Sequence, residues 1–168
     1  MTKLQFGRVA SPVGEILLVA DEASLVSLDF AGYEPRLHAL LRKRFGSYEL
    51  QEARDPLGML DRLGAYFAGR LAALDAIPVD TGGTAFQRSV WAALRRIPAG
   101  AVASYGQLAA ALGRPSASRA VGYANSLNPV AIVVPCHRVI GADRSLTGYA
   151  GGLERKRWLL AHEHAVAQ

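Results

Sequence analysis

The chain has 168 residues and a formal net charge of +5, with 51% hydrophobic and 20% charged residues. This composition is typical of a folded globular protein and excludes a disordered one, and no apolar run reaches the roughly 18 residues that a membrane-spanning helix needs. Residues 1–80 carry a net charge of −2 and residues 81–168 one of +7, which indicates either a polyanionic partner for the second half or a solvated basic surface.

Short strands are expected at the start of the chain. The first 30 residues alternate apolar stretches with the turn sequences Ser-Pro-Val-Gly and Asp-Glu-Ala-Ser, which predicts antiparallel strands joined by tight turns. Residues 34–45 predict a helix, because its basic last turn complements the helix dipole and Gly46 follows as a stop. We therefore expect a small antiparallel sheet with a helix.

A second helix is predicted between Asp55 and Gly69. Asp55 is a suitable N-cap and Pro56 a suitable first residue, and the apolar residues that follow share one helical face. With the strands before it, this helix predicts that the N-terminal part is an α+β unit.

A linker is predicted over residues 70–83, which end in Pro-Val-Asp-Thr-Gly-Gly. The charge balance changes sign there, and the glycines cannot continue a helix or strand. We therefore expect two domains: an α+β supporting domain over residues 1–80 and a mainly helical domain over residues 81–168.

Capping boxes mark two helices of the second half. Thr84 pairs with Gln87, and Ser104 pairs with Gln107, so that in each case the hydroxyl and the amide satisfy free backbone groups. The first of these helices is expected to end before Pro98, which cannot continue it.

Two short helices joined by a glycine-containing turn are predicted over residues 104–113 and 116–125, a pattern typical of a helix-turn-helix. The second helix is unusual for a reader of the major groove, because its small side chains cannot reach base edges but permit close backbone approach. These small residues are Ser116, Ala117, Ser118, Ala120, Gly122 and Ala124. Arg119 is the one long basic side chain there, and it either enters the duplex or contacts a phosphate.

Cys136 is the only cysteine, so the chain forms no internal disulfide, and its thiol fits a reducing, cytoplasmic setting. It follows an apolar segment, residues 131–134, that predicts a short buried strand, and it lies in the sequence Pro135-Cys136-His137-Arg138. A lone cysteine is either an inert apolar residue or a nucleophile. Because a free thiol has a pKa of about 8.5, a nucleophilic role requires a neighbouring base or cation.

His137 is the first candidate for this base. Neighbouring side chains of an extended strand point to opposite faces, so His137 reaches Cys136 only if the chain turns there or a water molecule bridges them. A carboxylate behind the imidazole would select its tautomer. The basic half offers three candidates: Asp143, Glu154 and Glu163.

Several segments of the second half together resemble one family. NPVAIVVPCHRVIG and SLTGYAGGLERKRWLLAHE are similar to the active-site region of the O6-alkylguanine-DNA alkyltransferases, and the similarity extends to FQRSVWAAL, IPAGAVASYGQLAAALGRP and SRAVGYAN. It covers essentially all of residues 84–163. The Pro-Cys-His-Arg core inside this longer frame is far more specific than those four residues alone.

The resemblance implies a single-use DNA repair protein that flips a damaged base out of duplex DNA and moves the alkyl group of O6-alkylguanine irreversibly onto Cys136. O4-alkylthymine is left open as a second substrate. His137 would be the water-linked base, and Glu163 the carboxylate that orients it. Asn128 would brace the turn before the active-site strand, and Tyr105 would donate a hydrogen bond to the guanine ring.

The same resemblance implies residues that contact the DNA and the flipped base. Arg119 would take the place of the flipped nucleotide. The DNA-facing residues beside it would be Ser116, Ala117, Ser118 and Gly122. The segment from Leu146 to Gly151 would wall the base pocket, which would be formed by Val139, Thr147, Gly148, Tyr149, Ala150, Gly151 and Lys156. Some relatives carry proline in place of Ala131 and serine in place of Ala150, which leaves the tolerated alkyl size open.

The resemblance further implies a ribonuclease H-like fold for the N-terminal domain, a monomer without a membrane partner, and no cofactor, with cooperative binding to DNA left open. Some relatives hold zinc in that domain through cysteine and histidine, but this chain has no cysteine there, so no metal is expected. His38, His162 and His164 match no family role, and we expect them at the surface.

Three other functions stay open on the residues alone. A Cys-His-Glu hydrolase would use the same triad, with an oxyanion hole that the sequence does not reveal. A non-catalytic lesion sensor would normally lack the reactive cysteine, and a helix-turn-helix transcription factor would need longer side chains on its recognition helix. Stoichiometric alkyl transfer to Cys136 distinguishes the alkyltransferase from all three.

Overall fold

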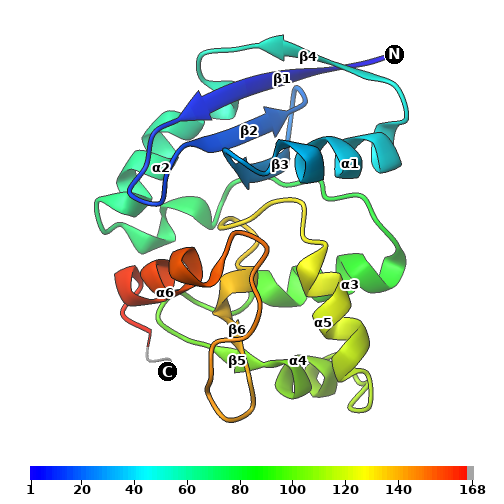
Figure 1. Ribbon diagram of the computed structural model, residues 1–168, viewed down its shortest axis with the longest axis vertical. Helices are drawn as coiled ribbons and strands as arrows, with labels where there is room; N and C mark the ends of the chain where they lie inside the picture. Colours follow the sequence, from blue (N-terminus) through cyan, green and yellow to red (C-terminus); the bar gives the residue numbers. More distant parts are fainter. Residues whose placement is uncertain (166–168) are drawn as a thin grey trace. The chain divides into compact units, whose positions relative to one another are not determined.

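The computed structural model describes residues 1–165, which form two compact units. Unit 1 comprises residues 1–82 and 129–133, and unit 2 comprises residues 83–128 and those from 134 onward. The chain therefore returns once to unit 1 before it continues to Cys136. Figure 1 shows the sheet with its helices in blue to teal and the mainly helical part in green to red.

Unit 1 is an α+β unit, as predicted. Its elements in chain order, with η for a 3-10 helix, are β1 (Thr2–Val9), β2 (Ile16–Ala20), β3 (Leu25–Phe30), α1 (Glu34–Phe45), β4 (Tyr48–Glu52), η1 (Pro56–Gly58), α2 (Met59–Phe67) and η2 (Leu71–Leu74). The strand order in the sheet is β3-β2-β1-β4. The predicted antiparallel pairing holds for β1, β2 and β3, whereas β4 lies parallel to β1 and makes the sheet mixed.

One face of this sheet is covered by α1, whose bounds agree with the prediction. Strand side chains alternate between two faces, so every second residue can meet the helix. The resulting core contains Leu4, Phe6, Leu17, Val19, Val26, Leu37 and Leu41. Leu37 and Leu41 are one helical turn apart and therefore both face the sheet. Gly46 ends the helix with a φ of 69°, a left-handed value that glycine adopts without strain.

The second helix of unit 1 begins later than predicted. Leu57 and Gly58 have φ values of 55° and 67°, which interrupt a right-handed helix. The residues from Pro56 onward therefore form the 3-10 turn η1, and α2 follows with Gly58 as its N-cap. Asp55 is not the N-cap of α2, although its Oδ1 accepts a hydrogen bond from the backbone N–H of Leu60 at 2.9 Å.

Unit 2 is mainly helical, as predicted. Its elements are α3 (Ala85–Arg95), β5 (Ala103–Ser104), α4 (Tyr105–Ala111), α5 (Ser118–Ser126), η3 (Cys136–Arg138), β6 (Val139–Ile140) and α6 (Leu153–His162). Both predicted capping boxes are confirmed: the hydroxyl of Thr84 accepts from the N–H of Gln87 at 3.1 Å, and that of Ser104 accepts from the N–H of Gln107 at 3.0 Å. α3 and α4 begin directly after these two caps.

The predicted helix-turn-helix pair consists of α4 and α5. α5 begins at Ser118, two residues later than predicted, because a turn precedes it. Its buried residues are Val121, Ala124 and Asn125. Trp91 of α3 donates an indole hydrogen bond to the carbonyl oxygen of Ala124 at 2.9 Å. One face of α5 is therefore held against α3, which leaves the opposite face to solvent.

The segment before Cys136 is not the strand that the sequence predicted. Residues 131–134 form a tight turn, in which the N–H of Val133 donates to the carbonyl oxygen of Ala131 at 2.8 Å. Ile132 has a φ of 70°, a value that β-branched residues rarely adopt and that costs roughly 1–3 kcal/mol. All four residues are buried, so the apolar pattern predicted burial correctly but could not distinguish a strand from a buried turn.

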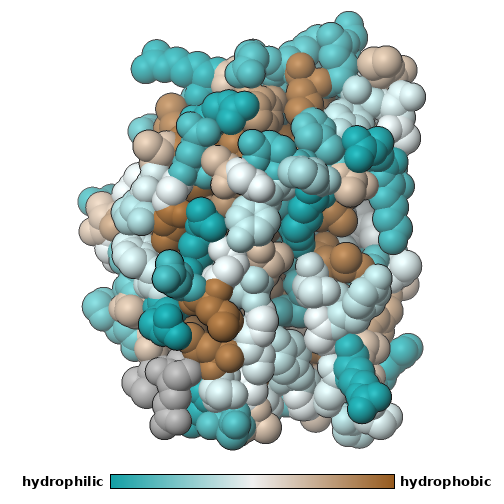
Figure 2. All heavy atoms as spheres, viewed as in Figure 1, coloured by the Kyte–Doolittle hydropathy of each residue, from teal (hydrophilic) through white to brown (hydrophobic). Residues whose placement is uncertain are grey.

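Apolar side chains are scattered over the surface. Figure 2 shows, on the face in view, small apolar patches separated by polar side chains. Among the described residues, the large hydrophobic side chains that are exposed are Met1, Tyr123 and Leu153. No helix in the described part of the chain is long and apolar enough to span a membrane.

Candidate active site

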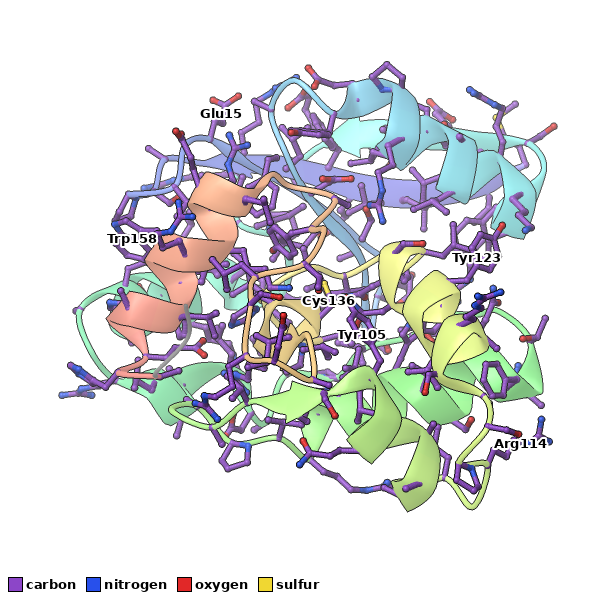
Figure 3. All side chains as sticks on the ribbon, turned by 60° about the horizontal axis from the view of Figure 1, so that its bottom comes forward. Glu15, Tyr105, Arg114, Tyr123, Cys136 and Trp158 are labelled. Carbon is purple, nitrogen blue, oxygen red and sulfur yellow. The ribbon has the colours of Figure 1, made fainter. Side chains whose placement is uncertain are left out.

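Cys136 is the first residue of η3 and lies just before β6. β6 pairs in parallel with β5, and α4 follows β5 directly, so this two-stranded sheet brings the start of α4 to the segment that contains the cysteine. Cys136 is only 5% exposed. Figure 3 shows Cys136 and Tyr105 in the same part of unit 2, between α5 and the loop that precedes α6.

Two asparagine side chains hold the backbone around the cysteine. Asn128 donates a hydrogen bond to the carbonyl oxygen of Val134 at 2.7 Å, and the amide nitrogen of Asn125 lies 3.5 Å from the carbonyl oxygen of Cys136. Both asparagines are buried. Asn128 thus spans the turn formed by residues 129–133, while Asn125 had not been singled out from the sequence.

His137 is completely buried, and its Nε2 lies 2.9 Å from Oε2 of Glu163. It belongs to a 3-10 helix rather than to an extended strand, so the chain turns at this point, which is one of the two conditions under which His137 was expected to reach Cys136. Of the three candidate carboxylates, the structure brings Glu163 to the imidazole. Asp143 instead accepts hydrogen bonds within its own turn, and Glu154 is exposed.

Arg138 also holds Glu163, although the sequence had assigned this arginine no role. Nε and Nη2 of Arg138 donate to the two carboxylate oxygens at 2.8 and 3.0 Å, and its Nη1 donates to the carbonyl oxygen of Ile97 at 2.6 Å. Arg138 is 6% exposed. A buried pair with this bidentate geometry recovers much of its desolvation cost. The sequence places Arg138 beside the histidine but does not reveal that Glu163 is buried or that Arg138 binds it.

Burial and charge together decide the protonation states of this group. Burial lowers the pKa of His137 below its ordinary value, the hydrogen bond and charge of Glu163 oppose this, and the charges of Arg138 and Lys156 add to it. Burial alone would raise the pKa of Glu163, but the hydrogen bonds and charges of His137 and Arg138 outweigh it and hold that pKa below its ordinary value. Glu163 is therefore ionised and His137 neutral at neutral pH.

This assignment decides the tautomer of His137. An ionised carboxylate only accepts hydrogen bonds, so Nε2 of the neutral ring must carry the proton that it donates to Glu163. Nδ1 is then the unprotonated nitrogen. It is buried and has no hydrogen-bond partner among residues 1–165, so its lone pair can accept a proton.

Lys156 is fully buried, and its ammonium group ties two segments together. Nζ donates to the carbonyl oxygens of Val139 at 2.6 Å and of Thr147 at 3.1 Å. Burial lowers the pKa of Lys156 to about 8, and the negative charge of the Cys136 thiolate opposes this shift. Lys156 is therefore mostly protonated at neutral pH, and its charge favours the thiolate form of the cysteine.

Tyr105 is the first residue of α4 and is partly buried. Its hydroxyl lies 2.8 Å from Oγ1 of Thr147. Its ring lies beside Gly122 of α5, where an added Cβ would be 3.6 Å from two ring carbons. Tyr105 therefore contacts both α5 and the loop that was expected to form the base pocket.

The other residues expected in the base pocket lie in β6 and in the loop after it. Val139 and Gly151 are buried, Thr147 and Tyr149 are partly buried, and Gly148 and Ala150 are exposed. Arg155 of α6 donates to the carbonyl oxygen of Gly151 at 2.9 Å. This bond, together with those of Lys156, connects α6 to the loop at Thr147 and Gly151 and to β6 at Val139.

The residues expected to face DNA lie at the start of α5 and in the turn before it. Ser116 and Arg119 are exposed, and Ala117, Ser118 and Gly122 are partly buried. Arg119 is the second residue of α5. Its exposed guanidinium is therefore placed to meet a ligand that approaches this helix.

The other histidines differ in their surroundings. His164 is exposed, and His38 and His162 are partly exposed, so all three lie at the surface as predicted. Nδ1 of His38 lies 2.5 Å from the hydroxyl of Tyr48, and the ring of His162 stacks on that of Trp158 with centroids 4.8 Å apart. Ring contacts of this kind make a half-buried position favourable for both.

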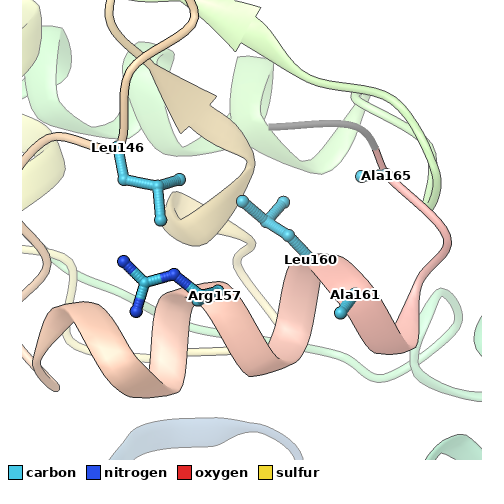
Figure 4. Close-up of a pocket in the computed structure, with 5 residues that line it drawn as sticks. All are labelled: Leu146, Arg157, Leu160, Ala161 and Ala165. Atoms are coloured by element: carbon cyan, nitrogen blue, oxygen red, sulfur yellow. The ribbon is translucent and has the colours of Figure 1, made fainter. Parts of the chain in front are cut away.

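A small pocket lies elsewhere on unit 2. Its lining residues, shown in Figure 4, are Leu146, Arg157, Leu160, Ala161 and Ala165. Leu146, the first residue of the segment expected to wall the base pocket, lines this pocket, and the other residues predicted to form the site do not. Within residues 1–165, no three His, Cys, Asp or Glu side chains lie close enough together to hold a metal ion.

The arrangement around Cys136 is suited to nucleophilic displacement. A buried thiol is followed by a neutral imidazole with an unprotonated nitrogen, and an ionised carboxylate stabilises the imidazolium that proton transfer would create. The ammonium group of Lys156 adds a positive charge. These groups can form a thiolate in a site that largely excludes water.

Both units match known protein families. Residues 5–81 match the ribonuclease-like domain of 6-O-methylguanine DNA methyltransferase, and residues 85–165 match its DNA-binding domain. The methylated-DNA–protein-cysteine methyltransferase of Salmonella typhimurium is 52% identical over 166 residues, which cover 97% of each chain. The protein of the same name from Mycolicibacterium paratuberculosis is 48% identical over 162 residues, which cover 95% of this chain and 92% of the relative.

Solved structures show the same fold over nearly the whole chain. The O6-methylguanine methyltransferase of Mycobacterium tuberculosis has a TM-score of 0.81 at 41% identity and covers 96% of this chain and 93% of its own. A structure described as Mycobacterium tuberculosis OGT in complex with DNA has a TM-score of 0.81 at 40% identity, covering 95% and 92%. The O6-methylguanine-DNA methyltransferase of Pyrococcus kodakaraensis has a TM-score of 0.75 at 28% identity, covering 95% and 98%.

Proposed function

The chain belongs to the 6-O-methylguanine DNA methyltransferase family, and from this premise we propose that it repairs O6-alkylguanine in duplex DNA. Its activity is DNA repair by alkyl transfer to a cysteine, and Cys136 is the acceptor because the chain has no other cysteine. The observation that carries the proposal is the buried His137–Glu163 pair, whose histidine directly follows this cysteine. That pair supplies a base and its counter-charge where a thiol must be activated.

The covalent step exchanges one bond for another. Sγ of Cys136 attacks the alkyl carbon in line with the bond to O6, so that an S–C bond forms while the C–O6 bond breaks and its electron pair stays on the guanine. The thiol proton passes through a water molecule to Nδ1 of His137, and the departing guanine takes up one proton, which balances the charge. The product is a thioether that water does not cleave, so each protein molecule acts once.

Glu163 stabilises the imidazolium that forms when His137 accepts this proton. Arg138 keeps the carboxylate ionised and aligned through its bidentate contact. Three buried side chains of unit 2, His137, Glu163 and Arg138, thereby hold Nδ1 of His137 in the state that accepts the proton. Lys156 adds a positive charge that favours the thiolate before attack.

Tyr105 assists the leaving group. Its hydroxyl, which lies within hydrogen-bond distance of Thr147 in this structure, donates to the guanine ring as negative charge develops there. The loop that contains Thr147 and Tyr149 forms a wall of the base pocket. Ala150 is smaller and less polar than the serine of some relatives, so we expect this wall to leave room for alkyl groups larger than methyl.

Base flipping follows from the position of the substrate atom. The O6 substituent is stacked inside the duplex and cannot reach a buried thiol, while extrusion of a poorly paired, damaged base costs only a few kcal/mol. α5 approaches the minor groove through its small residues, and Arg119 enters the space that the flipped nucleotide leaves. The exposure of Arg119 at the start of α5 supports this role.

The two units would divide the work. Unit 1 acts as a supporting domain and unit 2 binds DNA and carries the reaction, since the cysteine, its base and the helix-turn-helix all lie in unit 2. All of these groups belong to one chain, so the protein acts as a monomer, and the reaction needs no cofactor. A thiol that forms no disulfide is preserved best in a reducing compartment, which supports action in the cytoplasm.

A lesion panel tests the substrate class. Matched duplexes carry one O6-methylguanine, one O4-methylthymine, one N7-methylguanine or no lesion, each with an isotopically labelled methyl group, and transfer of the label to protein is measured over time. We expect fast transfer from O6-methylguanine that stops at about one methyl group per protein, and none from N7-methylguanine. Equal transfer from both guanine lesions would exclude recognition of the O6 position.

A further inference from the structure

The exposed face of α5 carries an aromatic residue that packing does not require. The residues on this face are Arg119, Ala120, Tyr123 and Ser126, spaced as one side of a helix. Tyr123 is 66% exposed. Among the described residues, its side chain has no hydrogen-bond partner and no ring partner. The backbone carbonyl oxygen of Tyr123 accepts a hydrogen bond from the hydroxyl of Ser126 at 2.6 Å.

The helix cannot rotate to bury this ring. Val121, Ala124 and Asn125 lie on the opposite, buried side, and Trp91 holds the carbonyl oxygen of Ala124. Tyr123 therefore presents a large apolar surface to solvent at a position set by the packing of its neighbours. Most other residues of α5 are small, so the large exposed ring of Tyr123 differs from its neighbours.

The charge around this face favours a polyanionic partner. Residues 81–142 contain no Asp or Glu but include six arginines. Arg119 lies one helical turn from Tyr123 on the same face, and Arg114 is exposed in the turn before α5. Figure 3 shows Tyr123 toward one end of α5 and Arg114 beyond the other end. A ring flanked by unopposed positive charge is suited to a polyanion with flat bases.

We propose that Tyr123 is a DNA-contacting residue whose ring packs against the sugar and base of a nucleotide close to the extruded one. Side chains four residues apart on a helix lie about 5–6 Å apart, and successive nucleotides of one strand are spaced by about 3.4 Å. If Arg119 occupies the position of the flipped nucleotide, Tyr123 lies within two base steps of it. This inference rests on the proposed function.

A second copy of this chain fits the exposed face of α5 less well than DNA does. Two such faces would bring Arg119 and Arg114 of each copy together, and like charges oppose that contact. A stable dimer also needs about 800 Å² of buried surface from each partner, far more than one aromatic side chain supplies. DNA supplies both the opposite charge and the stacking surface.

The test compares three variants for affinity to an undamaged fluorescent duplex, where no transfer can occur. Tyr123→Ala removes the ring, Tyr123→Phe keeps the ring without its hydroxyl, and Leu153→Ala removes the exposed large side chain of α6 as a matched control. We expect the dissociation constant to rise about fivefold or more for Tyr123→Ala, the lower end for loss of one aromatic–base contact. Tyr123→Phe and Leu153→Ala should bind like the parent.

The salt dependence separates stacking from charge. Tyr123 is neutral, so Tyr123→Ala should weaken binding by the same factor at every salt concentration, whereas Arg119→Ala should also reduce the slope. An unchanged thermal midpoint for Tyr123→Ala shows that the fold is intact. The proposal is overturned if Tyr123→Ala binds like the parent, or if it changes only self-association in sedimentation. Failure of the parent to accept a methyl group would instead refute the proposed function, whatever Tyr123 does.

Discussion

Nε2 of His137 lies 2.9 Å from Oε2 of Glu163, although 26 residues separate the two in the sequence. Both side chains are completely buried, and Arg138 binds the same carboxylate through two nitrogens. The histidine therefore has one nitrogen committed to a carboxylate and one left to accept a proton. This relationship underlies the account of how Cys136 is activated.

Glu163→Gln tests the charge of this carboxylate. The amide is nearly the same size but cannot neutralise Arg138, so a buried guanidinium loses its counter-charge, a change that typically costs about 3–5 kcal/mol. We expect the free energy of unfolding in urea to fall by an amount of this order and the rate of methyl transfer to fall at least about tenfold.

Glu154→Gln is the matched control, because Glu154 is exposed in the first turn of the same helix, α6. It should change the unfolding free energy by no more than about 0.5 kcal/mol and leave the rate unchanged. If Glu163→Gln behaves like Glu154→Gln in both measurements, the carboxylate of Glu163 neither stabilises the fold nor assists the transfer.

The pH dependence of stability tests the neutral state of His137. Burial lowers the pKa of His137 in the folded protein. Below pH 6.5 the imidazole therefore takes up a proton in the unfolded chain while it is still neutral in the folded protein. The free energy of unfolding is therefore highest above pH 6.5 and decreases as the pH falls, by up to about 1.4 kcal/mol per pH unit. Urea unfolding at several pH values between 7 and 5 measures this slope.

The control for the pH experiment is a pair of histidine variants. His137→Gln should flatten the slope between pH 6.5 and 5, whatever its effect on absolute stability, while His38→Gln in unit 1 should leave it in place. A slope that survives in His137→Gln would mean that other groups carry the acid sensitivity.

Tyr105→Phe tests the hydroxyl that we assign to the leaving group. The ring and its contact with Gly122 remain, so the fold should be unaffected. Loss of a donor aimed at developing charge commonly costs about 100-fold or more in rate, and we expect at least a tenfold loss here because the donor acts on a delocalised ring. Rapid-quench measurement of transfer at saturating protein gives the rate.

Thr147→Val separates this role from a structural one. It removes the other half of the 2.8 Å contact while leaving the Tyr105 hydroxyl in place. If the hydroxyl acts on guanine, Thr147→Val retains most of the transfer rate. Equal losses in the two variants would show that the contact only positions the loop.

Substitutions of the two asparagines near the cysteine should lower the free energy of unfolding by different amounts. Asn128→Ala leaves the buried carbonyl oxygen of Val134 without its 2.7 Å donor, and such a loss costs about 1–3 kcal/mol. The amide of Asn125 lies at 3.5 Å from the carbonyl oxygen of Cys136, so its hydrogen bond is weaker, and Asn125→Ala should destabilise the protein less. Urea unfolding of both variants checks the order, and a larger loss for Asn125→Ala would contradict it.

Local signals in the sequence predicted much of the fold. Thr84 with Gln87 and Ser104 with Gln107 satisfy backbone groups within four residues, so these helix starts were readable from the sequence alone. The start of α2 and the turn before Cys136 were not readable. Both depend on positive φ values, at Leu57 and Ile132, which neither residue type favours and which surrounding packing must impose.

The site residues that the family resemblance named were predicted from the sequence. The residues whose role depends on contacts with distant parts of the chain were missed. Arg138 was visible beside His137, but its partners Glu163 and Ile97 lie 25 and 41 residues away along the chain. Asn125 and the parallel pairing of β4 with β1 were missed for the same reason. No local pattern reveals such partners, since only the folded chain brings them together.

Mass spectrometry after mixing the protein with a slight excess of duplex carrying one O6-methylguanine tests the central claim most directly. The intact mass gives the stoichiometry, and peptide fragmentation locates the modification. We predict one methyl increment per molecule, on Cys136 alone, which does not increase with time or with more DNA. An unmodified Cys136 with the lesion still bound would indicate a lesion sensor, an unmodified Cys136 without lesion binding would leave the hydrolase, and either result would contradict the account.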